Sequence, residues 1–140
     1  MSSKLHQATC VAIKGRGLLI EGQPGSGKSS LALSLIDRGG TLVGDDGVSL
    51  EVRSGRLFAS PAPNISGLLE VRGLGLIPFP VLADVPVALV LRLDPKADRF
   101  IEQAARINLL GVEVPLVSLW PNSPALAIKA EIALRTYGKD

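Results

Sequence analysis

Apolar and polar residues along the first part of the chain are patterned in a way that predicts two strands, a loop and a helix. Residues 9–13 and 17–21 are short apolar runs typical of buried strands, and the polar turn at 14–16 predicts a hairpin between them. Residues 30–38 carry apolar side chains at helical spacing, and Gly39-Gly40 marks the end of that helix. The helix is predicted to bury Leu31, Ala32, Leu35 and Ile36.

The rest of the chain continues as short strands and ends in a helix. Strands are predicted at residues 41–45, 48–52, 57–60, 68–72, 86–93 and 114–119, and 86–93 is the most continuous apolar run and therefore the central one. Residues 1–8 are expected to be little ordered, 73–80 to form a loop, and 97–107 to form a short helix. A helix at 125–137 is predicted to turn inward Leu126, Ile128, Ile132, Ala133 and Leu134. Hairpins combined with a strand–helix–strand unit indicate an α/β fold with a mixed β-sheet.

Composition narrows the class of protein. A length of 140 residues with 46% hydrophobic residues suits one domain, residues 1–140, whose sheet is buried on both faces. The formal net charge of +2 argues against nucleic acid or an anionic membrane as a partner. The single cysteine, Cys10, lies in an apolar run and is expected to be a packed thiol in a reducing compartment. Because no signal peptide and no long apolar run occurs, we expect a soluble cytoplasmic protein.

A phosphate-binding loop is the strongest motif in the chain. Residues 22–29 match the pattern G-x-x-x-x-G-K-[ST] at every fixed position. Its glycines let backbone N–H groups surround polyphosphate oxygens, Lys28 adds a positive charge, and the Ser29 hydroxyl is a natural Mg²⁺ ligand. Because the loop follows a strand and opens a helix, the phosphates would lie at a helix N-terminus. We therefore expect nucleotide binding by Gly22, Gln23, Pro24, Gly25, Ser26, Gly27, Lys28, Ser29 and Ser30.

Two further stretches carry candidate chemistry. Asp45-Asp46 ends the strand that returns from the loop's helix, so topology places the pair at the sheet edge where the phosphates bind. Carboxylates there can orient a nucleophile or bind Mg²⁺, whereas the alternative is a turn, since Asp-Asp-Gly is good turn chemistry. Strand alternation places Glu70 and Arg72 on one face; spacing alone does not separate a site from a surface ion pair.

His6 and Arg99 are candidates of a different kind. His6 is the only histidine, and its position near the start of the chain is also that of a solvated side chain. Arg99 lies in Asp98-Arg99-Phe100, where it can reach a phosphate or cap a helix. Neither role follows from composition or spacing.

The loop, its helix and the stretches 37–39, 42–46 and 68–75 together resemble the catalytic domain of the HPr kinase/phosphorylase family. The stretch Leu-Leu-Glu-Val-Arg-Gly-Leu-Gly at 68–75 is the most specific part of the resemblance. The resemblance runs from about His6 to the final helix and implies a short form that consists of the catalytic domain. It also implies a phosphate-loop fold akin to phosphoenolpyruvate carboxykinase, ATP and Mg²⁺ as cofactors, and assembly as a hexamer. The implied activity is phosphorylation of a serine on HPr, the phosphocarrier of the bacterial phosphotransferase system.

The same resemblance implies roles for individual residues. Lys28 would bind the β- and γ-phosphates, and Ser29 and Glu70 would hold Mg²⁺, with Asp46 as a further metal ligand. Asp46 would also act as the base that takes the serine proton, and as an acid in the reverse phosphorolysis. Asp45 would support Asp46. Arg99 and His6 would correspond to an arginine and a histidine of the family's active site.

One departure from the family affects the reverse reaction. Before its last helix the family has a basic, glycine-containing loop linked to phosphorylase activity, whereas residues 119–125 of this chain carry no charge. The kinase residues are retained. Two alternatives to a protein kinase remain. A small-molecule kinase would usually carry an arginine-rich lid, which this sequence lacks, and a nucleotide sensor would bind ATP without turnover.

Overall fold

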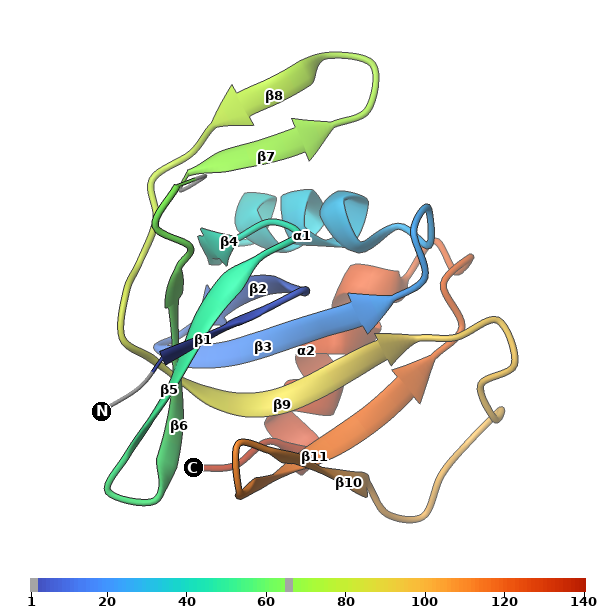
Figure 1. Ribbon diagram of the computed structural model, residues 1–140. Coiled ribbons are helices and arrows are strands. Elements are labelled where there is room, and N and C mark those ends of the chain that lie inside the picture. Colours follow the sequence, from blue (N-terminus) through green and yellow to red (C-terminus); the bar gives the residue numbers. More distant parts are fainter. Residues whose placement is uncertain (1–2, 65–66) are drawn as a thin grey trace.

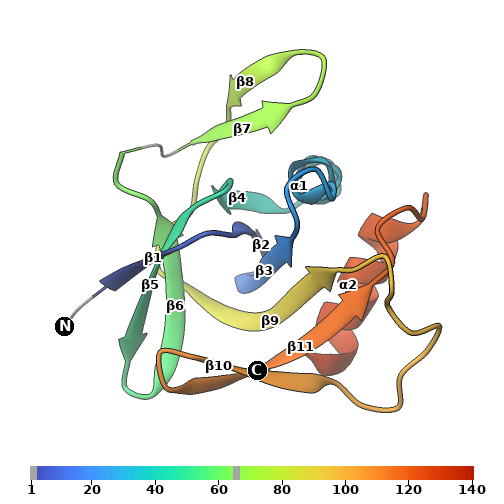
Figure 2. The same cartoon turned by 45° about the vertical axis from the view of Figure 1, so that its right-hand side comes forward.

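A curled, mixed β-sheet forms the framework of the protein (Figures 1 and 2). The computed structural model describes residues 3–64 and 67–140. Within these residues the strands are β1 (Ser3–His6), β2 (Thr9–Ile13), β3 (Arg16–Gly22), β4 (Thr41–Gly44), β5 (Val48–Arg53), β6 (Arg56–Pro61), β7 (Leu68–Val71), β8 (Gly75–Pro78), β9 (Val85–Leu93), β10 (Ala105–Leu109) and β11 (Val112–Leu119). The helices are α1 (Lys28–Asp37) and α2 (Leu126–Tyr137). None of the described helices is long and apolar enough to cross a membrane.

The strand order confirms a mixed sheet with β9 in its centre. The main path runs β1-β5-β6-β9-β3-β2-β4. β11 pairs with the carboxyl half of β9, on the edge opposite β3, and β10 pairs with β11. β9 pairs in parallel with β3 and β11 and antiparallel with β6. β4 and β3 flank β2 and are both antiparallel to it, so β4 runs parallel to β3. The carboxyl ends of β3, β4, β9 and β11 therefore point the same way, which is the edge where α/β sheets bind ligands.

Both faces of the sheet are buried, which explains the continuous apolar runs in β3 and β9. Leu18 and Ile20 point to the face covered by α1 and α2, while Leu19 points to the face covered by the β5–β6 hairpin. All three side chains are fully buried. Cys10 packs with Leu19 on the face covered by the β5–β6 hairpin, which confirms the expected packed thiol. Burial raises the pKa of this thiol to about 12.

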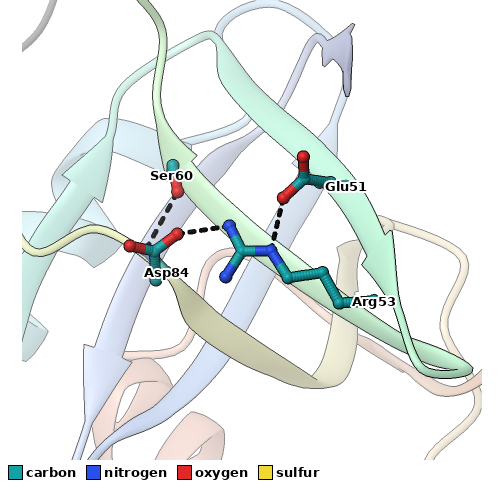
Figure 3. Close-up of polar contacts among 4 residues, drawn as sticks. All are labelled: Glu51, Arg53, Ser60 and Asp84. Atoms are coloured by element: carbon teal, nitrogen blue, oxygen red, sulfur yellow. Dashed lines mark hydrogen bonds and ion pairs between the residues drawn. The ribbon is translucent and has the colours of Figure 1, made fainter. Parts of the chain in front are cut away.

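A polar cluster fastens the β5–β6 hairpin to the chain that enters β9 (Figure 3). The Arg53 guanidinium donates to the carboxylates of Glu51 and Asp84, and the Asp84 N–H donates to Ser60 Oγ at 2.9 Å. The guanidinium also lies 5.0 Å from the centre of the Phe58 ring. Because the cluster is largely exposed, we expect it to orient the hairpin rather than to add much stability.

Three predictions of local structure were wrong. Part of 1–8 forms β1, which pairs with β5 in the register Lys4–Leu50; residues 1–2 lie outside the described part. The predicted loop 73–80 contains β8, which pairs with β7 as a hairpin over α1 (Figure 1). The predicted helix at 97–107 is absent, and its last residues belong to β10, which pairs with β11. These three strands are short and mostly exposed, as strands at a sheet edge often are. Their residues therefore show no clear alternation of apolar and polar side chains, and it is pairing with a neighbouring strand that makes them strands.

The predicted inward face of α2 was partly wrong. Ala133 and Leu134 are buried, as expected, and Ala130 is buried with them. Ile128 and Ile132 are instead 46% and 44% exposed. The small side chain at Ala130 lets this stripe of the helix approach the sheet closely, which turns the two isoleucines toward solvent. For α1 the predicted burial is confirmed, with Leu31, Ala32 and Leu35 in the core and Ile36 packed against it.

Candidate active site

The phosphate loop connects the end of β3 to the start of α1 and has the backbone that its glycines allow. Gly25 and Gly27 adopt positive φ angles of 80° and 103°, which side chains disfavour. A Cβ at Gly22 would lie 2.5 Å from Ser26 Oγ, so a larger residue at this position would force the Ser26 side chain to move. The Ser26 hydroxyl is buried and, within the described residues, has no hydrogen-bond partner. A buried hydroxyl in that state is stabilised by a polar ligand or water.

Lys28 is the first residue of α1 and folds back over the loop. Its Nζ donates to the carbonyl oxygens of Gly22 at 2.9 Å and Gln23 at 3.4 Å. The ammonium group is therefore held inside the curve of the loop by weak, neutral acceptors. Phosphate oxygens are stronger acceptors for an ammonium, so the same side chain can turn to them without a change of backbone.

A cleft of about 400 Å³ opens beside the loop. Its walls come from the loop, from the segments that begin β2 and follow β4, and from the β7–β8 hairpin. The lining residues are Gln7, Thr9, Gly22, Pro24, Gly25, Gly27, Lys28, Ser29, Ser30, Asp45, Asp46, Glu70 and Arg72. The structure thus brings most of the candidate residues from distant parts of the sequence to one place.

Asp45 is the hub of the hydrogen bonds in this cleft. Its Oδ1 accepts from the hydroxyls of Thr9 at 2.9 Å and Ser29 at 2.8 Å. Its Oδ2 accepts from the backbone N–H of Glu70 at 3.0 Å. One carboxylate therefore joins β2, the first turn of α1 and β7, and fixes the distance between the phosphate loop and the β7–β8 hairpin.

Asp46 has a different environment from Asp45. Its N–H donates to Thr9 Oγ1 at 3.3 Å, and its φ angle of 58° is unusual for a residue other than glycine. The side chain is exposed to the cleft, and within the described residues its carboxylate accepts no hydrogen bond. Backbone in this conformation is often found at functional sites, where surrounding contacts hold it. The free carboxylate is thus available to a substrate.

Glu70 and Arg72 both line the cleft, and they lie on one face, as their alternation along the predicted strand indicated. The alternate residues face the other way: Leu69 is fully buried and Val71 packs against the core. Glu70 and Arg72 are exposed, and among the described ion pairs none joins the two. The hairpin therefore presents one negative and one positive side chain to the cleft.

His6 and Arg99 are not among the residues that line the cleft. The His6 ring lies 3.2 Å from Glu21 Oε2, and Arg92 lies 3.2 Å from Glu21 Oε1. The hydrogen bond from His6 is the main cause that holds the pKa of Glu21 below its usual value, and the one from Arg92 adds to it, although burial acts to raise that pKa. Arg99 is exposed in the segment between β9 and β10. The active-site roles of His6 and Arg99 stay predictions.

Sequence reasoning missed Thr9 and Gln7. Thr9 is polar and fully buried in the core. A threonine inside an apolar strand gives no signal in the sequence, because it fits there as a β-branched residue. Gln7 lines the cleft from the turn between β1 and β2, a region expected to be little ordered. Only the pairing of these strands with the rest of the sheet brings the two side chains to the loop.

The oxygen atoms that line the cleft suit a magnesium ion that binds together with the phosphates of a nucleotide. Within the described part of the chain no group of three or more acidic, histidine or cysteine side chains forms a metal cage. Mg²⁺ commonly uses one or two protein oxygens and takes the rest from phosphates and water. The Ser29 hydroxyl donates a hydrogen bond to Asp45, so the lone pairs of its oxygen stay free to bind a cation.

Comparisons with known proteins give a consistent result. The family model described as HPr Serine kinase C-terminal domain matches residues 1–121. The HPr kinase/phosphorylase of Clostridium tetani is 48% identical over 149 aligned residues, which cover 96% of this chain and 48% of that protein. The corresponding protein of Chloroherpeton thalassium is 34% identical over 155 aligned residues, with coverage of 96% and 45%. The chain thus spans about half the length of these curated relatives.

A solved structure shares the fold. The Hpr(Ser) kinase/phosphatase from Coxiella burnetii superimposes with a TM-score of 0.83 at 28% sequence identity, over 94% of this chain and 88% of that one. The agreement includes the mixed sheet that the sequence predicted. On the family model, the relatives and the shared fold, the chain belongs to the HPr serine kinase C-terminal domain family.

Proposed function

We propose that the protein transfers the γ-phosphoryl group of Mg²⁺-ATP to a serine hydroxyl of HPr. The observation that carries the proposal is the Asp45 hydrogen-bond hub, which brings Ser29, Asp46 and Glu70 to one side of the phosphate loop. Phosphoryl transfer depends mainly on positioning and on charge placed where the transition state needs it. A cleft with a phosphate loop on one wall and carboxylates on the other meets both requirements.

The loop and its neighbours would bind the nucleotide. Backbone N–H groups of the loop surround the phosphates, and Lys28 exchanges its loop carbonyls for phosphate oxygens. Ser29 and Glu70 would hold Mg²⁺, and Asp46 is a further candidate ligand. The ion, when bound, neutralises charge on the phosphates.

Asp46 would take the proton from the substrate serine. Asp45 is occupied by three donors, so it is a poor proton acceptor and a good anchor. Asp46 is exposed in the cleft, and its backbone is held by Thr9. In the reverse direction the protonated Asp46 would act as the acid, with inorganic phosphate as the acceptor of the phosphoryl group. Because residues 119–125 are uncharged, we expect the forward reaction to dominate.

The hairpin beside the cleft supports a protein substrate. Leu74 and Leu76 are 76% and 64% exposed, and Arg72 lines the cleft next to them. Exposed apolar side chains grouped at the mouth of a site are typical of surfaces that bind another protein. We therefore infer that the β7–β8 hairpin contacts HPr, and expect the family's hexameric assembly in solution and a location in the cytoplasm.

The test is to incubate the protein with Mg²⁺-ATP and HPr and to map phosphate by intact-mass and peptide mass spectrometry. We expect one phosphoserine on HPr, absent with Lys28→Ala. Inorganic phosphate is then added to phosphorylated HPr to test the reverse reaction. Tight ATP binding without any phosphorylated HPr would contradict the proposal and favour a nucleotide sensor.

A further inference from the structure

Trp120 is a large aromatic side chain that the fold leaves half exposed. It is the only tryptophan of the chain, follows β11 directly, and is 50% exposed. The cleft described above accounts for the phosphate end of a nucleotide but includes no aromatic residue that could hold a base.

Strand register places Trp120 level with the phosphate loop. Gly22, at the start of the loop, pairs with Leu93 of β9, and Leu93 pairs with Leu119 of β11. These three residues lie abreast across three parallel strands, so Leu119 is about 10 Å from Gly22 at the usual strand spacing. Figures 1 and 2 both show the segment that follows β11 at the same end of the molecule as the phosphate loop.

The acidic side chains indicate which way a bound nucleotide would extend. The sheet order β11-β9-β3-β2-β4 places Asp45 and Asp46, which follow β4, on one side of the loop. The terminal phosphate would lie there, close to these carboxylates. The ribose and base would then extend to the opposite side, over the carboxyl ends of β9 and β11. Trp120 lies on that side.

The segment that carries Trp120 is well suited to stack on a neutral base. Pro121 and Pro124 restrict its backbone, and the Ser123 hydroxyl and carbonyl accept hydrogen bonds from the N–H groups of Ala125 and Leu126. The segment is therefore fixed before any ligand binds, which lowers the entropy cost of binding. Residues 119–125 carry no charge, so this surface is a poor site for a phosphate.

A second aromatic side chain lies on the neighbouring segment. Phe100, between β9 and β10, is 83% exposed, although the next residue, Ile101, packs against the core. The two segments start from the same point, because the Asp94 N–H donates to the Leu119 carbonyl at 3.0 Å. Exposed aromatic residues therefore occur on the segments that follow both strands.

We propose that Trp120 is the stacking platform for the purine base of the nucleotide whose phosphates lie in the loop. The inference rests on the proposed nucleotide binding and adds where and how the base is held. Every base has a π-face that stacks on an aromatic ring, and a purine offers the larger one. Replacement of Trp120 by alanine should therefore weaken binding of a nucleotide and leave binding of a phosphate chain unchanged.

The test uses two ligands, ATP and inorganic tripolyphosphate, which share the phosphate chain but not the base. We expect ATP to change the fluorescence of Trp120 and tripolyphosphate to leave it nearly unchanged. In calorimetry, Trp120→Ala should weaken ATP binding about tenfold or more and tripolyphosphate binding less than about twofold. Trp120→Phe should restore most of the ATP affinity. Ile132→Ala, which removes another exposed apolar side chain, is the matched control and should change neither.

The outcomes separate this inference from the proposed function. Equal weakening of both ligands by Trp120→Ala would show that the segment acts on the loop and would overturn the inference. Loss of ATP affinity with Phe100→Ala but not with Trp120→Ala would overturn it as well, in favour of the neighbouring ring. If the unchanged protein binds neither ligand, the proposed function itself fails.

Discussion

Thr9 offers the sharpest test of how the site is held together. Its buried hydroxyl donates to Asp45 at 2.9 Å and accepts from the Asp46 N–H at 3.3 Å. Thr9→Val has nearly the same shape but removes both bonds. A hydrogen bond to a charged group contributes about 1.5–3 kcal/mol, so we expect a loss of about 2 kcal/mol in the free energy of unfolding. For a domain of this size that corresponds to a Tm lower by roughly 5–10 °C.

The same change should lower catalysis more than nucleotide binding. Without the Thr9 acceptor, the Asp46 backbone is less firmly held at its positive φ angle, and small displacements of a catalytic group are costly. We expect kcat for HPr phosphorylation to fall about 10- to 100-fold, while the Kd for ATP changes less than about threefold. The assay combines urea unfolding, ATP calorimetry and the mass-spectrometric turnover measurement.

Thr9→Ser is the matched control, because it keeps the hydroxyl and loses only a methyl group. Its stability should fall by about 1 kcal/mol, with kcat within about threefold of the original protein. If the valine and serine variants have the same kcat, the hydroxyl does not position Asp46. A valine variant as stable as the original would refute the account of Asp45 as the hub.

The remaining predictions concern the loop and the response to acid. Gly22→Ala places a Cβ 2.5 Å from Ser26 Oγ, so it should weaken tripolyphosphate binding at least about tenfold. The double variant Gly22→Ala, Ser26→Ala should recover most of the affinity. If it does not, a contact other than the one with Ser26 is responsible for the loss. The hydrogen bond from His6, and after it the one from Arg92, lowers the pKa of Glu21 in the folded protein below its ordinary value of 4.5. The ionised Glu21 carboxylate therefore stabilises the fold above pH 4.5, and this stabilisation is lost as the pH falls through the lowered pKa of the folded state. Glu21→Gln should therefore flatten the acid side of the stability curve, measured by urea unfolding between about pH 6 and pH 3; a parallel curve would contradict this.

The candidate site could be predicted from the sequence where local chemistry defines it. The loop at 22–29 depends on glycine conformations and on its place between strand and helix, which are visible in the sequence. Asp45 and Asp46 followed from topology alone, because strands on either side of a helical connection end at the same edge. Alternation along the predicted strand at 68–72 correctly placed Glu70 and Arg72 on one face, although β7 itself ends at Val71.

The rest of the site depends on contacts between distant segments. Thr9 is separated by 36 residues from Asp45, and its role exists only because β2 pairs with β4. β1, β8 and β10 are likewise defined by their partner strands, since their own residues are mostly exposed and lack a clear pattern. The two isoleucines of α2 face solvent because Ala130 allows close packing of a different stripe. Such choices are made by tertiary packing, which no short window of sequence records.

We propose Asp46 as the proton acceptor of a phosphate-loop kinase and Asp45 as its anchor. The most direct measurement compares ATP affinity and HPr phosphorylation in the same preparation of Asp46→Asn. We expect a Kd for ATP within about threefold of the original and a loss of phosphoryl transfer of about 100-fold or more, because the site keeps its shape and loses its base. Equal losses of binding and turnover, or turnover that survives, would contradict the assignment of Asp46.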